Sequence, residues 1–289
     1  MKIKVSEIFY SAQGEGRFVG VPSVFLRTFG CNFTCGGFGM PAGTMSQERD
    51  AVDPAQYQKF EDLPLVTTGC DSYASWDPRF KRFSPSLDTA QIVDRMLALT
   101  PNRSSWQQHN GNPVHLVITG GEPLLGWQRA YPELLSHPGM RDCNWITFET
   151  NGTQRLTPEF AQYLRSWNQA QQPHGPGGEL TFSVSAKLSV SGERREEAIQ
   201  PQVVCEYEQL GYTYLKFVVE RQQDFDEVDE VVSIYRAAGF QGPVYVMPVG
   251  GVVSVYDGNR INVADEAMRR GYYYSPRLHV DIWGNGWGK

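Results

Sequence analysis

The sequence lacks the features that mark nucleic-acid-binding and membrane-spanning proteins. Its 26 Lys and Arg residues are outnumbered by 32 Asp and Glu residues, the net charge is -6, and no dense basic run is present. A broad phosphate-binding surface is therefore not expected, and we predict no nucleic-acid partner. No apolar stretch approaches the ~20 residues that cross a bilayer, and the polar start at residues 1–7 is unlike a signal peptide. We expect a cytoplasmic protein without membrane attachment.

Cysteine is also scarce. The chain has five, an odd number, and a cytoplasmic location disfavours disulfides. Cys143 lies beside a predicted strand and Cys205 in a predicted helix, so both are interpreted as small, semi-buried residues. The other three, Cys31, Cys35 and Cys70, are candidate metal ligands, because thiolates are soft donors. Their spacing alone leaves a metal site and structural cysteines equally open.

These three cysteines could bind either zinc or an iron–sulfur cluster. A structural zinc ion normally has four protein ligands, and no paired Cys or His lies near Cys70 to complete them. The five scattered His residues keep zinc open. Three thiolates suit a cubane cluster in which one iron stays free to bind another molecule.

Strand-like and helix-like segments alternate along the chain. The predicted strands are 23–28, 114–119, 145–149, 180–185, 214–219, 244–247 and 278–282. The predicted helices are 87–99, 127–136, 157–167, 193–209, 225–238 and 262–270. This alternation predicts an α/β fold with a mostly parallel sheet, in one domain spanning 1–289. Residues 36–69 have no clear period and are predicted to be a long inserted loop, and 169–178 a surface linker.

Several predicted strands end in polar and glycine residues. These ends read Thr-Gly-Gly-Glu-Pro at 119–123, Glu-Thr-Asn-Gly at 149–152 and Ser-Ala-Lys at 185–187. Each motif alone is typical of a turn. Because the carboxyl ends of parallel strands meet at one edge of a sheet, we expect the three motifs together to form one pocket.

Together these motifs resemble the radical S-adenosylmethionine (SAM) superfamily, and more closely the 7-carboxy-7-deazaguanine synthase (QueE) family. The blocks Phe-Tyr-Ser-Ala-Gln-Gly-Glu-Gly at 9–16 and Gly-Val-Pro-Ser-Val-Phe-Leu-Arg at 20–27 separate this family from most radical SAM enzymes. Gly-Cys-Asn at 30–32 and Cys-Asp-Ser at 70–72 add to the resemblance, which runs from Glu7 to the last residue. It implies a partial TIM-like β/α barrel of the radical SAM type.

The sequence departs from the family pattern at the third cysteine. Family members usually have two residues between the second and third cluster cysteines, and that count reaches Phe38 here. We interpret Cys70 as the displaced third ligand, because Cys-Asp-Ser and the aromatic Trp76 resemble the residues downstream of that cysteine in the family. The alternative is a cluster-free relative. Ser72 replaces the threonine that usually contacts Mg²⁺, and it keeps a hydroxyl oxygen, a ligand type that this hard cation favours.

The resemblance implies a role for each group of candidate residues, with no catalytic residue beyond the cofactor. The 4Fe–4S cluster would be held by Cys31, Cys35 and Cys70, and Mg²⁺ by Ser72. SAM would be bound by Gly120, Gly121, Glu122, Glu149, Asn151, Ser185 and Lys187. The substrate would be bound by Gln13, Glu15, Arg27 and Thr119. Lys216 and His279 have equally good structural explanations.

The implied reaction is the radical-mediated ring contraction of 6-carboxy-5,6,7,8-tetrahydropterin to 7-carboxy-7-deazaguanine, with loss of ammonia. This lyase reaction supplies precursors of queuosine and related deazapurines. The resemblance also implies an electron donor such as flavodoxin and a homodimer. Two alternatives stay open. One is a radical SAM enzyme with another substrate, such as an activase of a partner protein. The other is a non-catalytic regulatory protein, which the insertion at 36–69 gives a reason to consider. The aromatic and glycine residues at 283–289 are interpreted as closing over the substrate or packing at a dimer interface.

Overall fold

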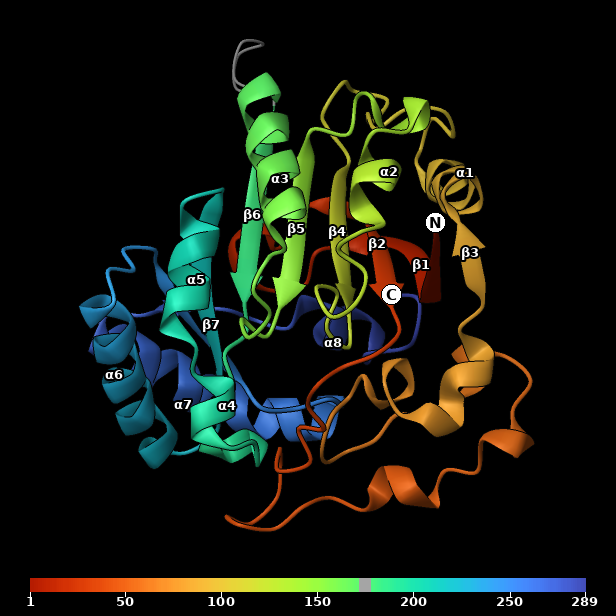
Figure 1. Cartoon of the computed structure of the whole chain (residues 1–289). Coiled ribbons are helices and arrows are strands. Elements are labelled where there is room, and N and C mark those ends of the chain that lie inside the picture. Colours follow the sequence, from red (N-terminus) through yellow and green to blue (C-terminus); the bar gives the residue numbers. More distant parts are fainter. Residues whose placement is uncertain (172–177) are drawn as a thin grey trace.

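The computed structural model describes residues 1–171 and 178–289 and contains a nine-stranded open sheet (Figure 1). Its strands are β1 (Lys2–Ala12), β2 (Pro22–Thr28), β3 (Ser86–Asp88), β4 (His115–Gly120), β5 (Trp145–Thr150), β6 (Glu179–Val184), β7 (Tyr212–Val219), β8 (Val244–Pro248) and β9 (Tyr273–Tyr274). Their order is β3-β1-β2-β4-β5-β6-β7-β8-β9. Strands β3, β1 and β2 are antiparallel neighbours, and from β2 to β9 every pairing is parallel. The predicted fold class is confirmed.

The described helices are α1 (Thr89–Leu99), α2 (Tyr131–Leu135), α3 (Pro158–Gln171), α4 (Arg195–Ala198), α5 (Pro201–Glu208), α6 (Gln222–Ala237), α7 (Val253–Arg270) and α8 (Leu278–Trp283). Most of them cover the outer face of the sheet, whereas α8 lies at the cavity described below. In Figure 1, α2, α3 and α5 lie over strands β4 to β6 on one side. None of the helices in the described part of the chain is both long and apolar enough to span a membrane.

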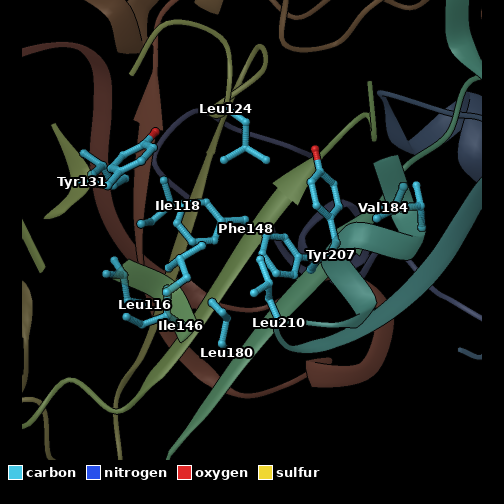
Figure 2. Packing of buried hydrophobic residues seen from close by; sticks show 14 of the residues in the cluster. Leu116, Ile118, Leu124, Tyr131, Ile146, Phe148, Leu180, Val184, Tyr207 and Leu210 are labelled. Carbon is cyan, nitrogen blue, oxygen red and sulfur yellow. The ribbon is translucent and has the colours of Figure 1, made fainter. Parts of the chain in front are cut away.

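The main core lies between these helices and the outward-pointing residues of the strands (Figure 2). Phe148 of β5 contacts Tyr131 of α2 and Phe160 of α3, with ring centroids 5.4 and 5.9 Å apart. Phe182 of β6 stacks on Tyr207 of α5 at 4.7 Å. Alternate residues of the same strands point to the opposite, inner face, where polar side chains are frequent. The pleat of each strand thus gives one face to the core and the other to the candidate site.

Helix α1 shows how local sequence sets a boundary. Asp88 precedes its first turn, and its carboxylate accepts the N–H of Gln91 at 2.9 Å. The Gln91 side chain in turn accepts the N–H of Asp88 at 3.1 Å. This reciprocal capping box satisfies two backbone donors that the helix itself leaves free.

Removing this cap gives a simple test of the fold. We expect Asp88→Ala to lower the free energy of unfolding by about 1 kcal/mol, because the Gln91 N–H loses its acceptor. Chemical denaturation followed by circular dichroism measures the change. Asp88→Asn keeps an acceptor oxygen and should lose less; equal losses in the two variants would contradict the capping role.

Some predicted elements are wrong or shifted. Residues 278–282, predicted as a strand, form helix α8: only Val280 is buried, and Ile282 is 55% exposed. The alternating residues there match a strand period, but they have no neighbouring strand to pair with. The helix predicted at 193–209 is split into α4 and α5, because Pro201 has no N–H to continue the first helix. The sequence does not predict strand β1, since charged residues interrupt its apolar pattern.

The segment 36–69, called the inserted segment below, has no strand and no α-helix, and the structure describes it throughout. It contains three short 3-10 helices, Glu48–Ala51, Pro54–Gln56 and Phe60–Asp62. Together with residues just beyond it, the segment forms a small core of its own, made of Val52, Phe60, Leu63, Val66, Tyr73, Ala74 and Phe80. Figure 1 shows it on the side to which strands β4 to β6 point. Most of the predicted linker at 169–178 lies outside the described residues.

His115 lies on the inner face at the start of β4. It is 2% exposed, and its Nε2 lies 2.8 Å from Thr147 Oγ1. Burial lowers the pKa of His115 to about 3. The unfolded chain therefore binds a proton near pH 6.5 that the folded protein does not bind until much lower pH. The stability that depends on this neutral ring is complete above about pH 6.5 and is lost as the pH falls.

A comparison of pH profiles isolates this effect. Between pH 7.5 and pH 5, the wild-type protein should lose about 2 kcal/mol more stability than His115→Gln, because only the wild type carries the buried imidazole. Urea unfolding at both pH values measures the two free energies. Parallel profiles for the two proteins would show that His115 is not held neutral by the fold.

Candidate active site

A cavity of about 240 Å³ opens at the carboxyl ends of the parallel strands. Every residue that the sequence assigns to the cluster, SAM, the substrate or Mg²⁺ lines it, with the single exception of Glu122. Those at the ends of β2, β4, β5 and β6 meet because these strands are parallel. Gln13 and Glu15 come from the turn after the antiparallel strand β1, and Cys70 and Ser72 follow the inserted segment. What each residue binds stays a prediction.

The three candidate cluster cysteines share one wall of the cavity. Cys31 and Cys35 lie in the loop after β2, and Cys70 follows the inserted segment; all three pack with Phe33 and Phe38. The Glu193 carboxylate holds the first loop by accepting the N–H groups of Thr34 and Cys35 at 2.7 and 2.6 Å. The inserted segment therefore returns the chain to the position at which its third cysteine faces the other two.

The surroundings of these three thiols oppose their ionisation. Burial raises the pKa of Cys31 to about 12 and also raises the pKa of Cys35 and Cys70. The ammonium group of Lys187 opposes this rise at all three positions. A coordinated metal deprotonates thiols outright and offsets the burial of their charge. The Trp76 indole N–H donates to Cys70 Sγ at 3.3 Å and fixes the orientation of that side chain.

The donor set fits a cluster better than a single ion. Among the described residues, no three His, Cys, Asp or Glu side chains are grouped so that they could hold one metal ion. In a cubane cluster each thiolate binds a different iron, so the thiols stand further apart than the ligands of a single ion. Three soft thiol donors lie on one wall of the cavity, a donor type that suits iron–sulfur clusters.

Gly120 and Gly121 are required by the close packing of two loops. A Cβ at Gly120 would lie 2.5 Å from the carbonyl oxygen of Thr28. A Cβ at Gly121 would lie 2.5 Å from the carbonyl oxygen of Gly30 and 2.8 Å from Cys31 Cβ. Only glycine therefore lets the end of β4 approach the loop that carries the first cysteine. Their backbone faces the cavity next to Cys31.

Glu122 has a different position from the other predicted SAM residues. It is fully buried and accepts hydrogen bonds from the N–H of Leu124 at 3.0 Å, from Thr150 Oγ1 at 2.8 Å and from the N–H of Asn151 at 2.6 Å. Burial raises its pKa to about 7, although these hydrogen bonds oppose the rise. Glu122 thus joins the ends of β4 and β5 beneath the cavity.

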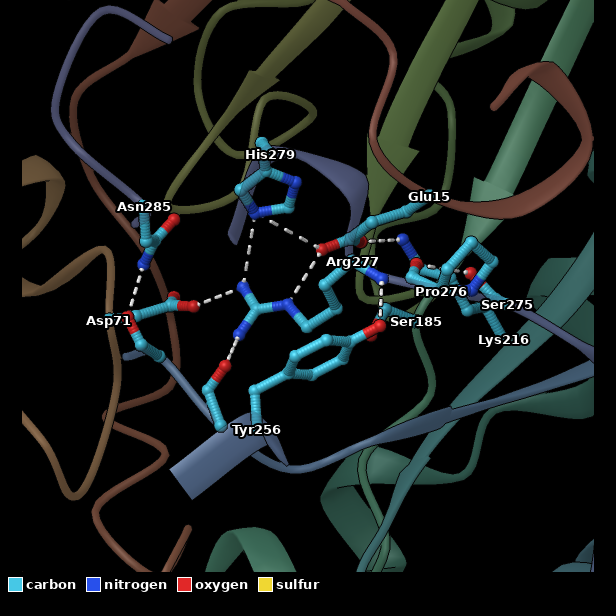
Figure 3. Close-up of polar contacts among 12 residues, drawn as sticks. Glu15, Asp71, Ser185, Lys216, Tyr256, Ser275, Pro276, Arg277, His279 and Asn285 are labelled. Carbon is cyan, nitrogen blue, oxygen red and sulfur yellow. Dashed lines mark hydrogen bonds and ion pairs between the residues drawn. The ribbon is translucent and has the colours of Figure 1, made fainter. Parts of the chain in front are cut away.

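A network of charged residues forms another wall of the cavity (Figure 3). Glu15, whose side chain is 14% exposed, pairs with Lys216 Nζ at 2.5 Å and with Arg277 Nε at 3.2 Å. Arg277 Nη2 also pairs with Asp71 at 2.5 Å. His279 Nε2 lies 3.8 Å from the Glu15 carboxylate. The network therefore links the end of β1, strand β7, the start of α8 and the residue next to Cys70.

The charges in this network stabilise one another. Burial alone would raise the pKa of Glu15, but Lys216, Arg277 and His279 outweigh it and lower that pKa. Burial would also lower the pKa of Lys216 and Arg277, and their acidic partners raise both instead. Burial and the Arg277 charge lower the pKa of His279 to about 4. At neutral pH the wall carries an ionised Glu15 beside a neutral His279.

The predicted substrate and SAM residues contact each other directly. Gln13 Nε2 donates to Glu149 at 3.0 Å, and Gln13 Oε1 accepts the N–H of Glu15 at 3.1 Å. Arg27 is the other charged residue of this group: its Nε pairs with Glu7 at 2.9 Å, and its Nη1 donates to Ser72 at 3.3 Å. One edge of the guanidinium is thus held by an acid.

The sequence alone does not identify all of the charged residues of the cavity. It leaves the roles of Lys216 and His279 open, and it does not point to Glu7, Asp71 or Arg277. A lone Lys inside an otherwise apolar strand and an Asp adjacent to a cluster cysteine are signals that could have identified two of them. Arg277 follows β9 in a loop, and nothing in its neighbours indicates a partner at Glu15 or Asp71.

Comparison with known proteins finds relatives of this chain that match over nearly its whole length. No family model matches the chain. The 7-carboxy-7-deazaguanine synthase of Pyrobaculum aerophilum is 28% identical over 290 residues, which cover 100% of this chain and 98% of the relative. The proteins of the same name from Halobacterium salinarum and Rhodopirellula baltica are 29% and 28% identical and cover 97% of this chain each, and 90% and 86% of their own lengths.

The chain is thus similar over its whole length to 7-carboxy-7-deazaguanine synthases. The predicted resemblance is confirmed. The crystal structure of QueE from Escherichia coli matches with a TM-score of 0.54 at 18% identity and covers 96% of this chain and 95% of its own. At this identity the match supports the fold. In this chain, the charged network described above lines the candidate site.

The charge network can be tested through stability. We expect Arg277→Met to lower the free energy of unfolding by about 2–3 kcal/mol, because Glu15 loses one of its two cations and the partly exposed Asp71 loses its partner. The control is Arg260→Met, which breaks an exposed pair with Asp281 and should cost about 1 kcal/mol or less. Denaturant midpoints measure both. A similar, small loss in both variants would contradict the role of Arg277.

Proposed function

We propose that this protein is a 7-carboxy-7-deazaguanine synthase, which contracts the ring of 6-carboxy-5,6,7,8-tetrahydropterin with loss of ammonia. The observation that carries the proposal is the full-length similarity to relatives of that name, joined to a cavity lined by the residues that the family resemblance selects. In this proposal residues 1–289 form one radical SAM domain, with 36–69 as an insertion between cluster ligands.

Cys31, Cys35 and Cys70 would hold a 4Fe–4S cluster and leave one iron for SAM. When bound, the cluster and SAM together supply the hydrogen-atom abstraction that begins the ring contraction. The protein's part is to hold both in place and to exclude water. The position of the thiols, with Cys35 buried and Cys31 and Cys70 half-buried, supports that part, as do the Glu193 hydrogen bonds to the cysteine loop and the Trp76 bond to Cys70.

SAM would lie between the cluster cysteines and the ends of β4 to β6. The backbone at Gly120 and Gly121 is open to its methionine end, and the Lys187 ammonium, bonded to Ser185 Oγ at 2.9 Å, offers a partner for its carboxylate. Glu149 and Asn151 face the same cavity and are suited to ribose hydroxyls. Glu122 would act indirectly, by fixing Asn151.

The pterin would lie against the charged wall. The ionised Glu15 and the Gln13 amide suit the N–H and carbonyl groups of an amino-pyrimidinone edge. Arg27 keeps its Nη edge for the substrate carboxylate, while Glu7 holds its Nε. Thr119 lines the cavity between the two ligands. Ser72, next to Arg27, offers a hydroxyl oxygen for Mg²⁺ shared with that carboxylate.

We also propose a homodimer and an electron donor such as flavodoxin, since a reductive radical reaction needs a source of electrons. Exposed apolar side chains on α7 and α8 support association with a second copy: Ile261 is 67%, Met268 68% and Ile282 55% exposed.

Cysteine variants test the proposal. Anaerobically reconstituted wild-type protein should bind about four irons and form 7-carboxy-7-deazaguanine from the carboxypterin and SAM. Cys70→Ala should lose the cluster and the activity, whereas Cys205→Ala, remote from the cavity, should keep both. Iron analysis, EPR and product detection measure these outcomes. A wild-type protein with an intact cluster that cleaves SAM but forms no product would show that the substrate is another molecule.

A further inference from the structure

The last residues of the chain form part of the cavity wall. Asn285, Gly286, Trp287, Gly288 and Lys289 all line it, and we call residues 284–289 the Trp287 strip. Gly284, Asn285 and Gly288 have positive φ angles of 62, 63 and 77°. Because glycine loses more conformational entropy than other residues when it is ordered, fixing a strip with three glycines against the cavity is costly. Contacts from other residues must therefore hold the strip in place.

The anchor of the strip is Trp287, and its partners come from and beside the inserted segment. Its indole N–H donates to the carbonyl oxygen of Leu63 at 2.8 Å. Its ring meets Phe60 edge-on, with centroids 4.9 Å apart, and Tyr73 at 6.1 Å. Phe60, Leu63 and Tyr73 are all members of the small core described above. A second contact, from Asn285 Nδ2 to the Gly251 carbonyl at 2.7 Å, holds the start of the strip.

The strip reaches the charged residues proposed for the substrate carboxylate. Gly288 lines the same cavity as Glu7 and Arg27, and its backbone is among the groups that lower the pKa of Glu7 against the larger effect of burial. Glu7 pairs with Arg27, which in turn donates to Ser72. A shift of Trp287 would therefore move a neighbour of the Glu7–Arg27 pair, although Trp287 makes no hydrogen bond to either residue in the described part of the chain.

We propose that the inserted segment and its small core bind the side chain of Trp287. This contact holds the Trp287 strip in place as the wall over the substrate end of the cavity. Trp287 and Phe60 are then positioning residues, and residues 36–69 complete the site in addition to separating two cluster cysteines. The identity of the substrate rests on the proposed function; the contact between strip and inserted segment does not.

The enzymatic test compares Trp287→Ala with Trp283→Ala, whose side chain is 38% exposed and outside the cavity lining. We expect Trp287→Ala to raise the KM for the carboxypterin roughly tenfold or more, because the wall is displaced. Iron content, the KM for SAM and the values for Trp283→Ala should stay near wild type. Trp287→Phe keeps a ring in the small core and should recover part of the loss. A wild-type KM for the pterin in Trp287→Ala would overturn the proposal.

A double-mutant cycle tests the coupling itself. Phe60→Ala should raise the same KM, and Phe60→Ala/Trp287→Ala should be little worse than the stronger single variant, because both remove one contact. Fully additive effects would contradict a shared role. Both variants leave the cysteines and the charge network intact.

Hydrogen exchange separates this inference from the proposed function, because it needs no turnover. In Trp287→Ala, amides at 57–66 should exchange faster than in the wild type and in Trp283→Ala, since the inserted segment loses its partner. Unchanged protection at 57–66 would overturn the proposal even in an active enzyme. Faster exchange in a protein that forms no product would refute the proposed function but would still support the contact between Trp287 and the inserted segment.

Discussion

One buried carboxylate, that of Glu15, holds the open side of this fold together. In the nine-stranded open sheet, β1 and β2 lie far from β7, β8 and β9 in the strand order and do not hydrogen-bond to them as strands. Glu15, in the turn after β1, links the two sides through its ion pairs with Lys216 on β7 and Arg277 beyond β9. The two cations offset the cost of its burial, and Glu15 in turn stabilises the charge of each.

The same network explains how the third cysteine keeps its place. Arg277 reaches Asp71, and Asp71 is the direct neighbour of Cys70. The chain between Cys35 and Cys70 can therefore be long and irregular, because the far end is fixed by a charge pair and by the Trp76 hydrogen bond rather than by a short loop. The entropy of closing a longer loop rises only slowly with its length. An insertion at this point costs little as long as these contacts remain.

The parts of the site that follow strands could be predicted from the sequence. Thr119, Glu149, Ser185 and the glycines next to Thr119 are predictable because strand direction alone brings strand ends together. Neither α8 nor the role of Arg277 is predictable in this way, since both depend on contacts with residues more than 200 positions away. Glu122 shows the remaining limit. Its motif placed it near the site, but only the structure shows that its carboxylate is occupied by backbone donors beneath the cavity.

The two faces of the sheet are stabilised by different interactions, apolar packing on the outer face and polar contacts on the inner face. The inserted segment lies on the side of the inner face. On the outer face, apolar residues pack against helices and tolerate only changes that conserve volume. On the inner face, many polar residues have polar partners, and at its open end loops add the Asp71–Arg277 pair and the Trp287 strip to the cavity wall. A sheet that opens toward a ligand needs added chain to close over it. The small core of the inserted segment gives such added chain an apolar surface of its own on which to fold, so that closing the cavity does not depend on the ligand alone.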